Sequence, residues 1–134
     1  MKVKYLLITS TILTLYFIII PTLCLAMHVV DGARQPKLTA HEMIATAYCI
    51  NGTTATGTQT RVGIAASKKE WFGKPAIVYL KGEDGNAGEL LGTYIIEDTG
   101  SKPIRNGKVI DIWMPTRDEC VEFGRKEVIV YIEE

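Results

Sequence analysis

The sequence predicts a mainly β protein, built as a closed or nearly closed barrel of six strands with one or two short helices. Three observations lead to this expectation. Short runs rich in β-branched and aromatic residues recur along the chain after residue 42. Clusters of glycine, threonine, asparagine and serine separate these runs. Helical patterns are few and short, and many strands with regular turn signals are typical of a barrel.

Six segments are expected to form strands, because each combines apolar, β-prone residues and ends at a turn signal. They are residues 43–50, 62–67, 75–81, 89–98, 108–114 and 127–133. The segment GEDGNAG at 82–88 has the composition of a hairpin turn between the third and fourth strands. Gly92 interrupts the fourth strand and indicates a bulge.

Two short helices are expected between the strands. Residues 68–73, KKEWFG, fit one helical turn that ends at Gly73. The segment 115–125 opens with Pro-Thr, and Thr116 and Glu119 have the spacing of a capping box. This pattern indicates a helix that leads into the last strand.

Two segments lack a hydrophobic period and are expected to be loops, residues 51–63 and 99–107. The first is rich in glycine and threonine, like a phosphate-binding loop. However, no Gly-Lys-Ser/Thr sequence follows it, so a nucleotide site is disfavoured. Hydroxyls and backbone amides of such a loop, with Thr58 and Thr60 among them, suit the wall of a sugar-binding groove.

The first 26 residues have the features of a secretory signal peptide. Lys2 and Lys4 precede an uncharged apolar stretch, and small residues lie before a cleavage point after Ala26. The alternative is a retained membrane anchor, because residues 5–26 are long enough to span a bilayer. In both cases the folded part is expected outside the cell membrane.

Residues 27–42 contain glycine, proline and charges without a sustained period, so they are expected to be a linker. The barrel domain is expected at residues 43–134. His28 and His41 fall in the linker, which disfavours a serine–histidine catalytic pair in the folded region.

The composition of the exported part excludes some classes of partner. The 15 Lys and Arg residues fall to 13 when Lys2 and Lys4 leave with the signal, against 15 Asp and Glu residues. The net charge is then near −2, without a basic stripe, so nucleic acid is not an expected partner. Nothing in the sequence requires a metal or an organic cofactor, and we expect a monomer.

The cysteines leave two alternatives open. Cys24 lies in the signal, and Cys49 and Cys120 remain in the exported part. An even pair in an exported domain permits a disulfide, and two buried free thiols are the other interpretation. No CxxC motif or Cys/His cluster is present, so a zinc site has no support.

An aspartate in the middle of a strand is the most informative feature. In VIDIW at 109–113, side chains alternate, so Asp111 shares a face with Val109 and Trp113, and Ile110 and Ile112 take the better core face. Aspartate is disfavoured in strands. A carboxylate beside an aromatic ring suits a sugar-binding groove. An exposed position on an edge strand is the alternative.

A second aspartate ends the fourth expected strand. By the same alternation Asp98 groups with Ile96 and Tyr94. Asp98 also begins the sequence DTG, and an aspartate there can simply start a turn by accepting local backbone hydrogen bonds. Both interpretations stay open.

Five motifs in this order resemble the bacterial three-aspartate (3D) domain. They are ATAYC, GTQTRVGIAAS, EDTG, NGKVIDIW and FGRKEVIVYI, and the resemblance covers about residues 44–132. It implies a double-psi β-barrel, similar to the barrel of membrane-bound lytic transglycosylase A and to the stationary-phase survival muralytic proteins. These proteins cleave or remodel peptidoglycan.

The resemblance also implies roles for individual residues. VIDIW matches the family's aspartate-containing strand and makes Asp111 the expected general acid/base, and EDTG supplies Asp98. Ser67 stands where the family has its first aspartate. The chain is therefore expected either to work with two aspartates or to be a non-catalytic module that binds the wall or regulates another protein.

The activity that the resemblance implies is lytic transglycosylation at the MurNAc–GlcNAc bond, which leaves a 1,6-anhydro end. The resemblance implies peptidoglycan glycan strands as the partner and a bacterial protein that is secreted or associated with the cell wall. The residues expected to contact them are Tyr48, Thr58, Thr60, Ser67, Thr99 and Trp113.

Overall fold

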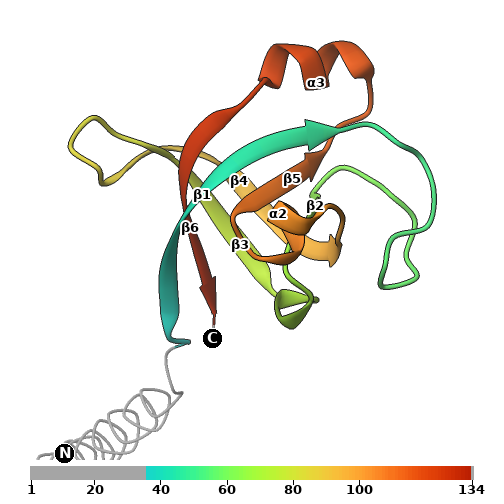
Figure 1. Ribbon diagram of the computed structural model, residues 1–134, viewed down its shortest axis with the longest axis horizontal. Coiled ribbons are helices and arrows are strands. Elements are labelled where there is room, and N and C mark those ends of the chain that lie inside the picture. Colours follow the sequence, from blue (N-terminus) through green and yellow to red (C-terminus); the bar gives the residue numbers. More distant parts are fainter. Residues whose placement is uncertain (1–35, 134) are drawn as a thin grey trace, which may run out of the picture. The chain divides into compact units, whose positions relative to one another are not determined.

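The computed structural model describes residues 36–133, which form a closed barrel of six strands in the order β1-β5-β2-β4-β3-β6 (Figure 1). The expected signal segment and the first part of the expected linker lie outside the described residues. The strands are β1 Leu38–Tyr48, β2 Ile64–Ala66, β3 Pro75–Lys81, β4 Ala87–Asp98, β5 Val109–Trp113 and β6 Lys126–Glu133. The expected mainly β fold with six strands is therefore confirmed for this part of the chain.

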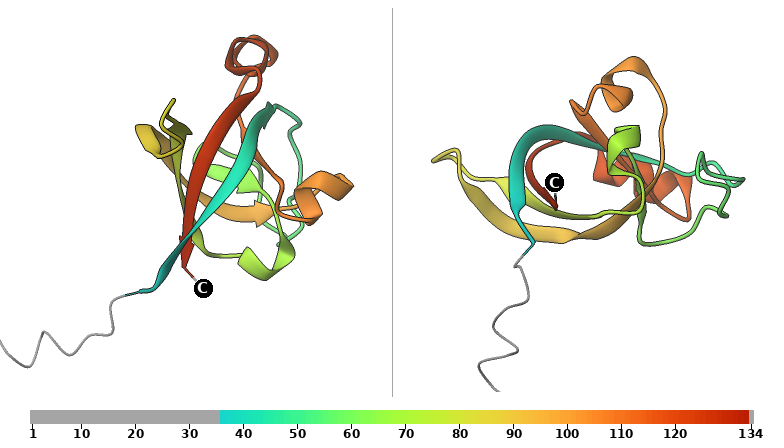
Figure 2. Two further views of the ribbon diagram at one scale, coloured as in Figure 1. Left: turned by 60° about the vertical axis from the view of Figure 1, so that its left-hand side comes forward. Right: turned by 90° about the horizontal axis from the view of Figure 1, so that it is seen from below.

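The barrel closes through both parallel and antiparallel pairs. Strand β1 lies between β6, its antiparallel partner, and β5, its parallel partner. The short strand β2 pairs with β4 in parallel and with β5 in antiparallel orientation. Figure 2 shows the strands wrapping around one interior, with the β3–β4 hairpin and the loop after β1 projecting on opposite sides. Each strand in the closed ring has two neighbours, but residues 87–94 of β4 pair with β3 alone and residues 38–43 of β1 pair with β6 alone.

The interior is filled by side chains that alternate along the strands. On β5, Ile110 and Ile112 are fully buried and Asp111 between them is not. The predicted core face of this strand is therefore confirmed. The buried apolar cluster consists of Met43, Ala45, Ala65, Trp71, Ala76, Val78, Ile96, Ile110, Ile112, Val128, Val130 and Ile132.

The connections follow local sequence signals closely. A 3-10 turn, η1, covers Lys69–Trp71, and Gly73 follows it with a positive φ of 79°. Helix α3, Arg117–Phe123, begins with the predicted capping box: the Thr116 hydroxyl accepts from the Glu119 amide, and the Glu119 carboxylate accepts from the Thr116 amide. The register of β3 and β4 shifts next to Gly92, as the glycine indicated.

Two expected boundaries were wrong. Strand β1 begins at Leu38, so residues 38–42 are strand and not linker. These residues pair with β6 from Leu38 opposite Glu133 onward, and this long-range pairing outweighs their weak apolar pattern. The expected loop 99–107 contains the four-residue helix α2, Lys102–Arg105. Pro103 is tolerated in its first turn, and Ile104 is buried.

None of the helices within residues 36–133 is long and apolar enough to cross a membrane.

Candidate active site

The strand register brings the two aspartates into one row. Ala66 on β2 pairs with Asp98 on β4 on one side and with Asp111 on β5 on the other. Thr46 on β1 continues the row, because it pairs with Asp111. Neighbouring strands lie about 4.8 Å apart, so the two aspartates are separated by only two strand spacings. Residues far apart in the sequence thus form one row across four neighbouring strands, with Ala66 between the two aspartates.

The expected grouping of Asp98 with Ile96 on one strand face was wrong, because the strand register shifts next to Asp98. The pairing of β2 with β4 shifts between Ala65 and Ala66, so that Ala65 faces Ile96 and Ala66 faces Asp98. The extra residue, Glu97, breaks the simple alternation by which Asp98 was grouped with Ile96. Ile96 is fully buried in the core, whereas the Asp98 carboxylate reaches a surface cavity.

That cavity has a volume of about 420 Å³, within the range of small-molecule sites. Both aspartates line it, and the single methyl group of Ala66 lies in the row between them. A larger side chain at residue 66 would fill this space. The cavity is lined by Tyr48, Ile50, Gly52, Thr53, Thr60, Ala66, Asp98, Thr99, Gly100, Ser101, Ile104 and Asp111.

Asp111 is half-buried, and its environment favours the protonated carboxyl group. Burial is the largest cause and raises the pKa of Asp111, the hydrogen bond from Thr46 lowers it, and the negative charge of Asp98 raises it again. The net shift is upward. The Thr46 hydroxyl donates to Asp111 Oδ1 at 2.6 Å, which holds the carboxyl group in place.

Asp98 has a different environment, because donors surround it. Among the described residues, the Tyr48 hydroxyl donates to Oδ2 at 3.2 Å, and the amides of Ala55 and Thr99 donate to Oδ1 at 3.0 and 2.9 Å. Burial, followed by the charge of Asp98, strongly raises the pKa of Tyr48. The phenol therefore stays protonated and keeps donating. A carboxylate that accepts from three donors on different segments is suited to position those segments.

Asp111→Asn should change the pH dependence of stability in a defined direction. The raised pKa means that folded Asp111 binds its proton more tightly than the unfolded chain does. Its contribution to stability is complete below the unfolded pKa and is lost as the pH rises through the folded pKa. The free energy of unfolding of the asparagine variant, minus that of the wild type, should therefore increase from about pH 3 to about pH 7. Urea unfolding at both pH values measures this difference, and an unchanged difference would contradict it.

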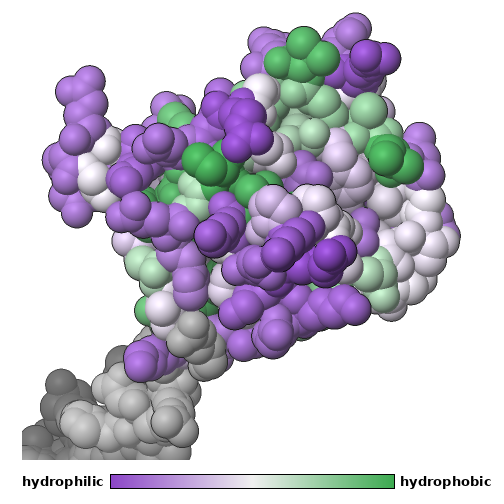
Figure 3. Space-filling view, viewed as in Figure 1, coloured by the Kyte–Doolittle hydropathy of each residue, from purple (hydrophilic) through white to green (hydrophobic). Residues whose placement is uncertain are grey.

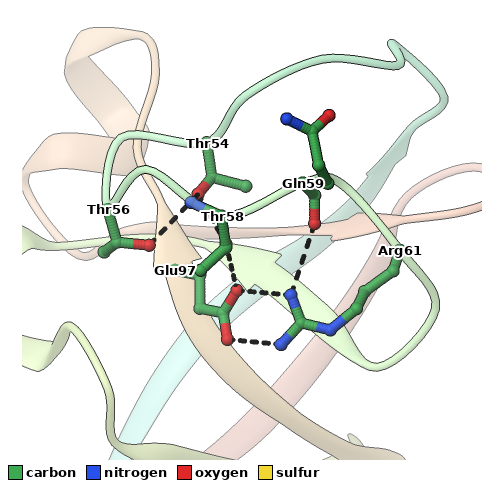
Figure 4. A network of polar contacts seen from close by, with 6 residues as sticks. All are labelled: Thr54, Thr56, Thr58, Gln59, Arg61 and Glu97. Carbon is green, nitrogen blue, oxygen red and sulfur yellow. Dashed lines mark hydrogen bonds and ion pairs between the residues drawn. The ribbon is translucent and has the colours of Figure 1, made fainter.

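The threonine-rich loop, residues 49–63, is attached to β4 by a polar network (Figure 4). Arg61 donates to both oxygens of Glu97, at 2.7 and 2.6 Å, and Thr58 donates to the same carboxylate. The Thr54 hydroxyl is buried and bonds the Thr58 hydroxyl at 2.9 Å. The hydrogen bond of Arg61, the largest cause, lowers the pKa of Glu97, so the network persists at neutral pH. It holds the loop beside Asp98.

Arg61→Ala should loosen this loop with little loss of global stability. The Arg61 side chain is half exposed, and exposed ion pairs contribute little to the stability of a fold. We expect faster hydrogen exchange at the Thr54 and Thr58 amides. The melting temperature should stay close to that of wild type. Lys81→Ala, which removes the exposed Lys81–Glu42 pair elsewhere on the barrel, should leave loop exchange unchanged. Equal exchange in both variants would rule out this role of Arg61.

Only some of the residues expected to bind substrate lie in the cavity. Tyr48, Thr60 and Thr99 line the cavity with the aspartates. The Thr99 hydroxyl is buried and, within residues 36–133, has no hydrogen-bond partner, which is costly unless a ligand or water completes it. Thr58 does not line the cavity, and its hydroxyl donates to the Glu97 carboxylate instead.

Ser67 is not placed to contact a substrate. Its side chain is 0% exposed, and its hydroxyl donates to the Val109 carbonyl at 3.4 Å. The Ser67 amide donates to the Asp98 carbonyl at 2.9 Å. Ser67 therefore supports the backbone next to Asp98, and its small size suits a fully buried position between β4 and β5.

Trp113 lies in a different cavity from Asp111. Its indole nitrogen donates to the Ile50 carbonyl at 3.1 Å, which holds the ring at the start of the loop. The ring lines a second cavity of about 480 Å³ next to α3, with Met114 and Phe123. Hydrophobic surface also gathers at α3 in Figure 3. We place the candidate site in the smaller of these two cavities, because Asp98 and Asp111 line it and the charge of Asp98 raises the pKa of Asp111.

Two residues that shape the cavity row, Thr46 and Ala66, were not expected from the sequence. Thr46 lies two residues before Tyr48 on the same strand face, so alternation could have identified it. Ala66 gives no local signal, since its importance comes from pairing with two strands at once. Within residues 36–133, no group of three or more His, Cys, Asp and Glu side chains is placed to hold a metal ion.

The fold and the site together define a small β-barrel with a cavity that contains two carboxyl groups. No family model, curated protein or solved structure matched the chain.

Proposed function

We propose that the protein is an exported enzyme that cleaves peptidoglycan as a lytic transglycosylase does, at the MurNAc–GlcNAc bond. The observation that carries this proposal is the position of Asp111, half-buried in a cavity that it shares with Asp98. A carboxyl group with a raised pKa can hold a proton that it must donate. The cavity volume is adequate for a sugar ring.

The reaction uses one carboxyl group twice. Protonated Asp111 donates its proton to the glycosidic oxygen as the bond to the MurNAc C1 carbon breaks. The resulting carboxylate accepts the proton of the C6 hydroxyl of the same sugar, and that oxygen bonds to C1. The product carries a 1,6-anhydro end and Asp111 is protonated again. Because no water attacks, the two-carboxylate spacing rules for hydrolases do not apply.

The other groups of the cavity have roles that follow from their contacts. The charge of Asp98 raises the pKa of Asp111 and, through the Ala55 amide, Asp98 holds the loop at the cavity wall. Tyr48 is a candidate for stacking on a sugar face, because its ring lines the cavity. Ala66 leaves room for the ring between the carboxyl groups.

The resemblance to the 3D domain supports the proposal from a separate direction. It implies a double-psi arrangement, and two parallel strand pairs within a closed six-stranded barrel are compatible with it. The aspartates that the resemblance selected line one cavity. Export, by a cleaved signal or a retained anchor, is part of the proposal, because the substrate lies outside the cell membrane.

Digestion of purified peptidoglycan by the exported protein, with mass analysis of the products, tests the proposal. We expect soluble fragments with 1,6-anhydro ends. Reducing ends would point to hydrolysis and would overturn the transglycosylase mechanism. Absence of any fragment over a range of pH would overturn the enzymatic proposal.

A non-catalytic module that binds the wall is the second candidate, and Ser67 favours it. A fully buried serine stands where the resembled family has its first aspartate, so one carboxyl group of that family's set is missing. This candidate predicts binding of the protein to isolated cell wall without release of fragments. A regulatory module would instead form a stable complex with another protein and bind sugar weakly.

A further inference from the structure

Cys49 and Cys120 lie near each other where helix α3 packs on the end of β1. Cys49 directly follows Tyr48, the last residue of β1, and Cys120 lies in the middle of α3. The helix contacts β1, and Figures 1 and 2 show it beside the end of that strand. Both cysteines are partly exposed free thiols, and the Cys49 thiol lies close enough to Cys120 to raise its pKa. They are 71 positions apart in sequence, from 49 to 120, so only the tertiary fold brings them together.

The surroundings fix both partners. The Met114 amide donates to the Tyr48 carbonyl at 2.8 Å, which ties the end of β1 to the residue after β5. Helix α3 is held at its start by the capping box of Thr116. Two neighbouring thiols on restrained backbones need only a limited movement to reach bonding distance.

We propose that Cys49 and Cys120 are oxidised to a disulfide in the exported protein and that this bridge fastens α3 to the end of β1. The proposal rests on the export that is part of the proposed function, because disulfides persist outside the cytoplasm. It does not depend on cleavage of peptidoglycan.

The oxidant is a disulfide, either of an exported thiol–disulfide oxidoreductase or of a small molecule. One cysteine loses its proton, attacks one sulfur of that disulfide and expels the other as a thiolate. The second cysteine then loses its proton and attacks the protein sulfur of the mixed disulfide. One S–S bond forms in the protein, and the oxidant takes up two electrons and two protons as two thiols. Partial burial, followed by the neighbouring Cys49 thiol, raises the pKa of Cys120, so this thiol loses its proton less readily than an exposed one.

The location of the bridge gives it a structural consequence for the site. Cys49 is the neighbour of Tyr48, whose hydroxyl donates to Asp98. A bond from Cys49 to α3 restrains the strand end that carries this phenol. It also closes a loop of about 70 residues, for which the loss of chain entropy in the unfolded state is large.

Peptide mapping tests the bridge without any assay of activity. The full chain is expressed in a bacterium that exports it, collected outside the cytoplasm, alkylated without reductant and digested with trypsin. We expect residues 38–61 and 118–125 to appear as one linked species that reductant separates. Cys24→Ser is the matched control and should leave the linked species unchanged. Alkylated Cys49 and Cys120 in the exported protein, or a link from either to Cys24, would overturn the proposal.

Thermal unfolding supplies a second measurement. Reductant should lower the melting temperature of the wild-type exported protein by about 10 °C or more. Cys120→Ser should melt near the reduced wild type and should not respond to reductant. Equal melting temperatures of the oxidised and reduced wild type would overturn the stabilising role. If the linked peptides are found but no wall fragments are released, the bridge stands and only the enzymatic proposal fails.

Discussion

Asp111→Asn is expected to lower peptidoglycan cleavage by about 10²–10⁴-fold, the usual contribution of proton transfer by a placed side chain. Asparagine has nearly the same shape but cannot donate a proton to the glycosidic oxygen. Its amide can still accept from the Thr46 hydroxyl, which donates to Asp111 in the wild type. The cavity should therefore keep its form. Release of anhydro fragments over time, with wild-type and variant protein at equal concentration, measures the effect.

Asp118→Asn is the matched control for this substitution. Asp118 is an exposed residue in the first turn of α3 and does not line the candidate cavity. The Asp118→Asn variant should cleave peptidoglycan at the wild-type rate. Circular dichroism of both variants should match that of the wild type. Full activity of Asp111→Asn would show that Asp111 is not the acid.

Asp98→Asn is expected to lower turnover by about 10- to 100-fold at neutral pH, because each hydrogen bond to a charged acceptor contributes about 1.5–3 kcal/mol. Asp98 accepts from Tyr48 and from the Ala55 amide of the loop, so the variant weakens both attachments. It also removes the negative charge that raises the pKa of Asp111. The proton of Asp111 is then lost at lower pH.

The pH profile distinguishes this effect from simple loss of structure. Cleavage needs protonated Asp111, so the rate falls as the pH rises through its pKa. In Asp98→Asn this decline should move to lower pH. Tyr48→Phe is the comparison, because it removes one donor and leaves the Asp98 charge in place. Tyr48→Phe should lower the rate, but the fall of its rate with rising pH should not move to lower pH. A profile of Asp98→Asn that is unshifted would contradict the electrostatic role.

The elements of the fold were predictable where short-range chemistry decides. The capping box of Thr116 and Glu119 lies within four consecutive residues, and the turn at Gly73 needs a backbone conformation that glycine adopts easily. The alternation around Asp111 also held, because the core side of a strand follows a period of two. By contrast, the start of β1 at Leu38 depends on pairing with β6, and no local pattern contains that partner.

The candidate site was predictable in its aspartates and less so in its walls. Asp111 stood out because a carboxylate inside an apolar strand is unusual. Trp113, two residues away on the same strand, was expected in the same groove. However, its hydrogen bond to the Ile50 carbonyl places it in another cavity. Ser67 was expected to contact the substrate and is fully buried.

By itself, the amino-acid sequence determined the number of strands, their order along the chain and the two unusual carboxylates, because these follow from local periodicity and residue chemistry. Only the tertiary structure decided that Asp98 and Asp111 share a cavity, since their proximity depends on the double pairing of Ala66 and on the bulge at Glu97. It also decided that Cys49 and Cys120 are neighbours, because helix α3 packs on β1. Strand register and helix packing are long-range properties, and they set which distant side chains meet and how much water reaches them.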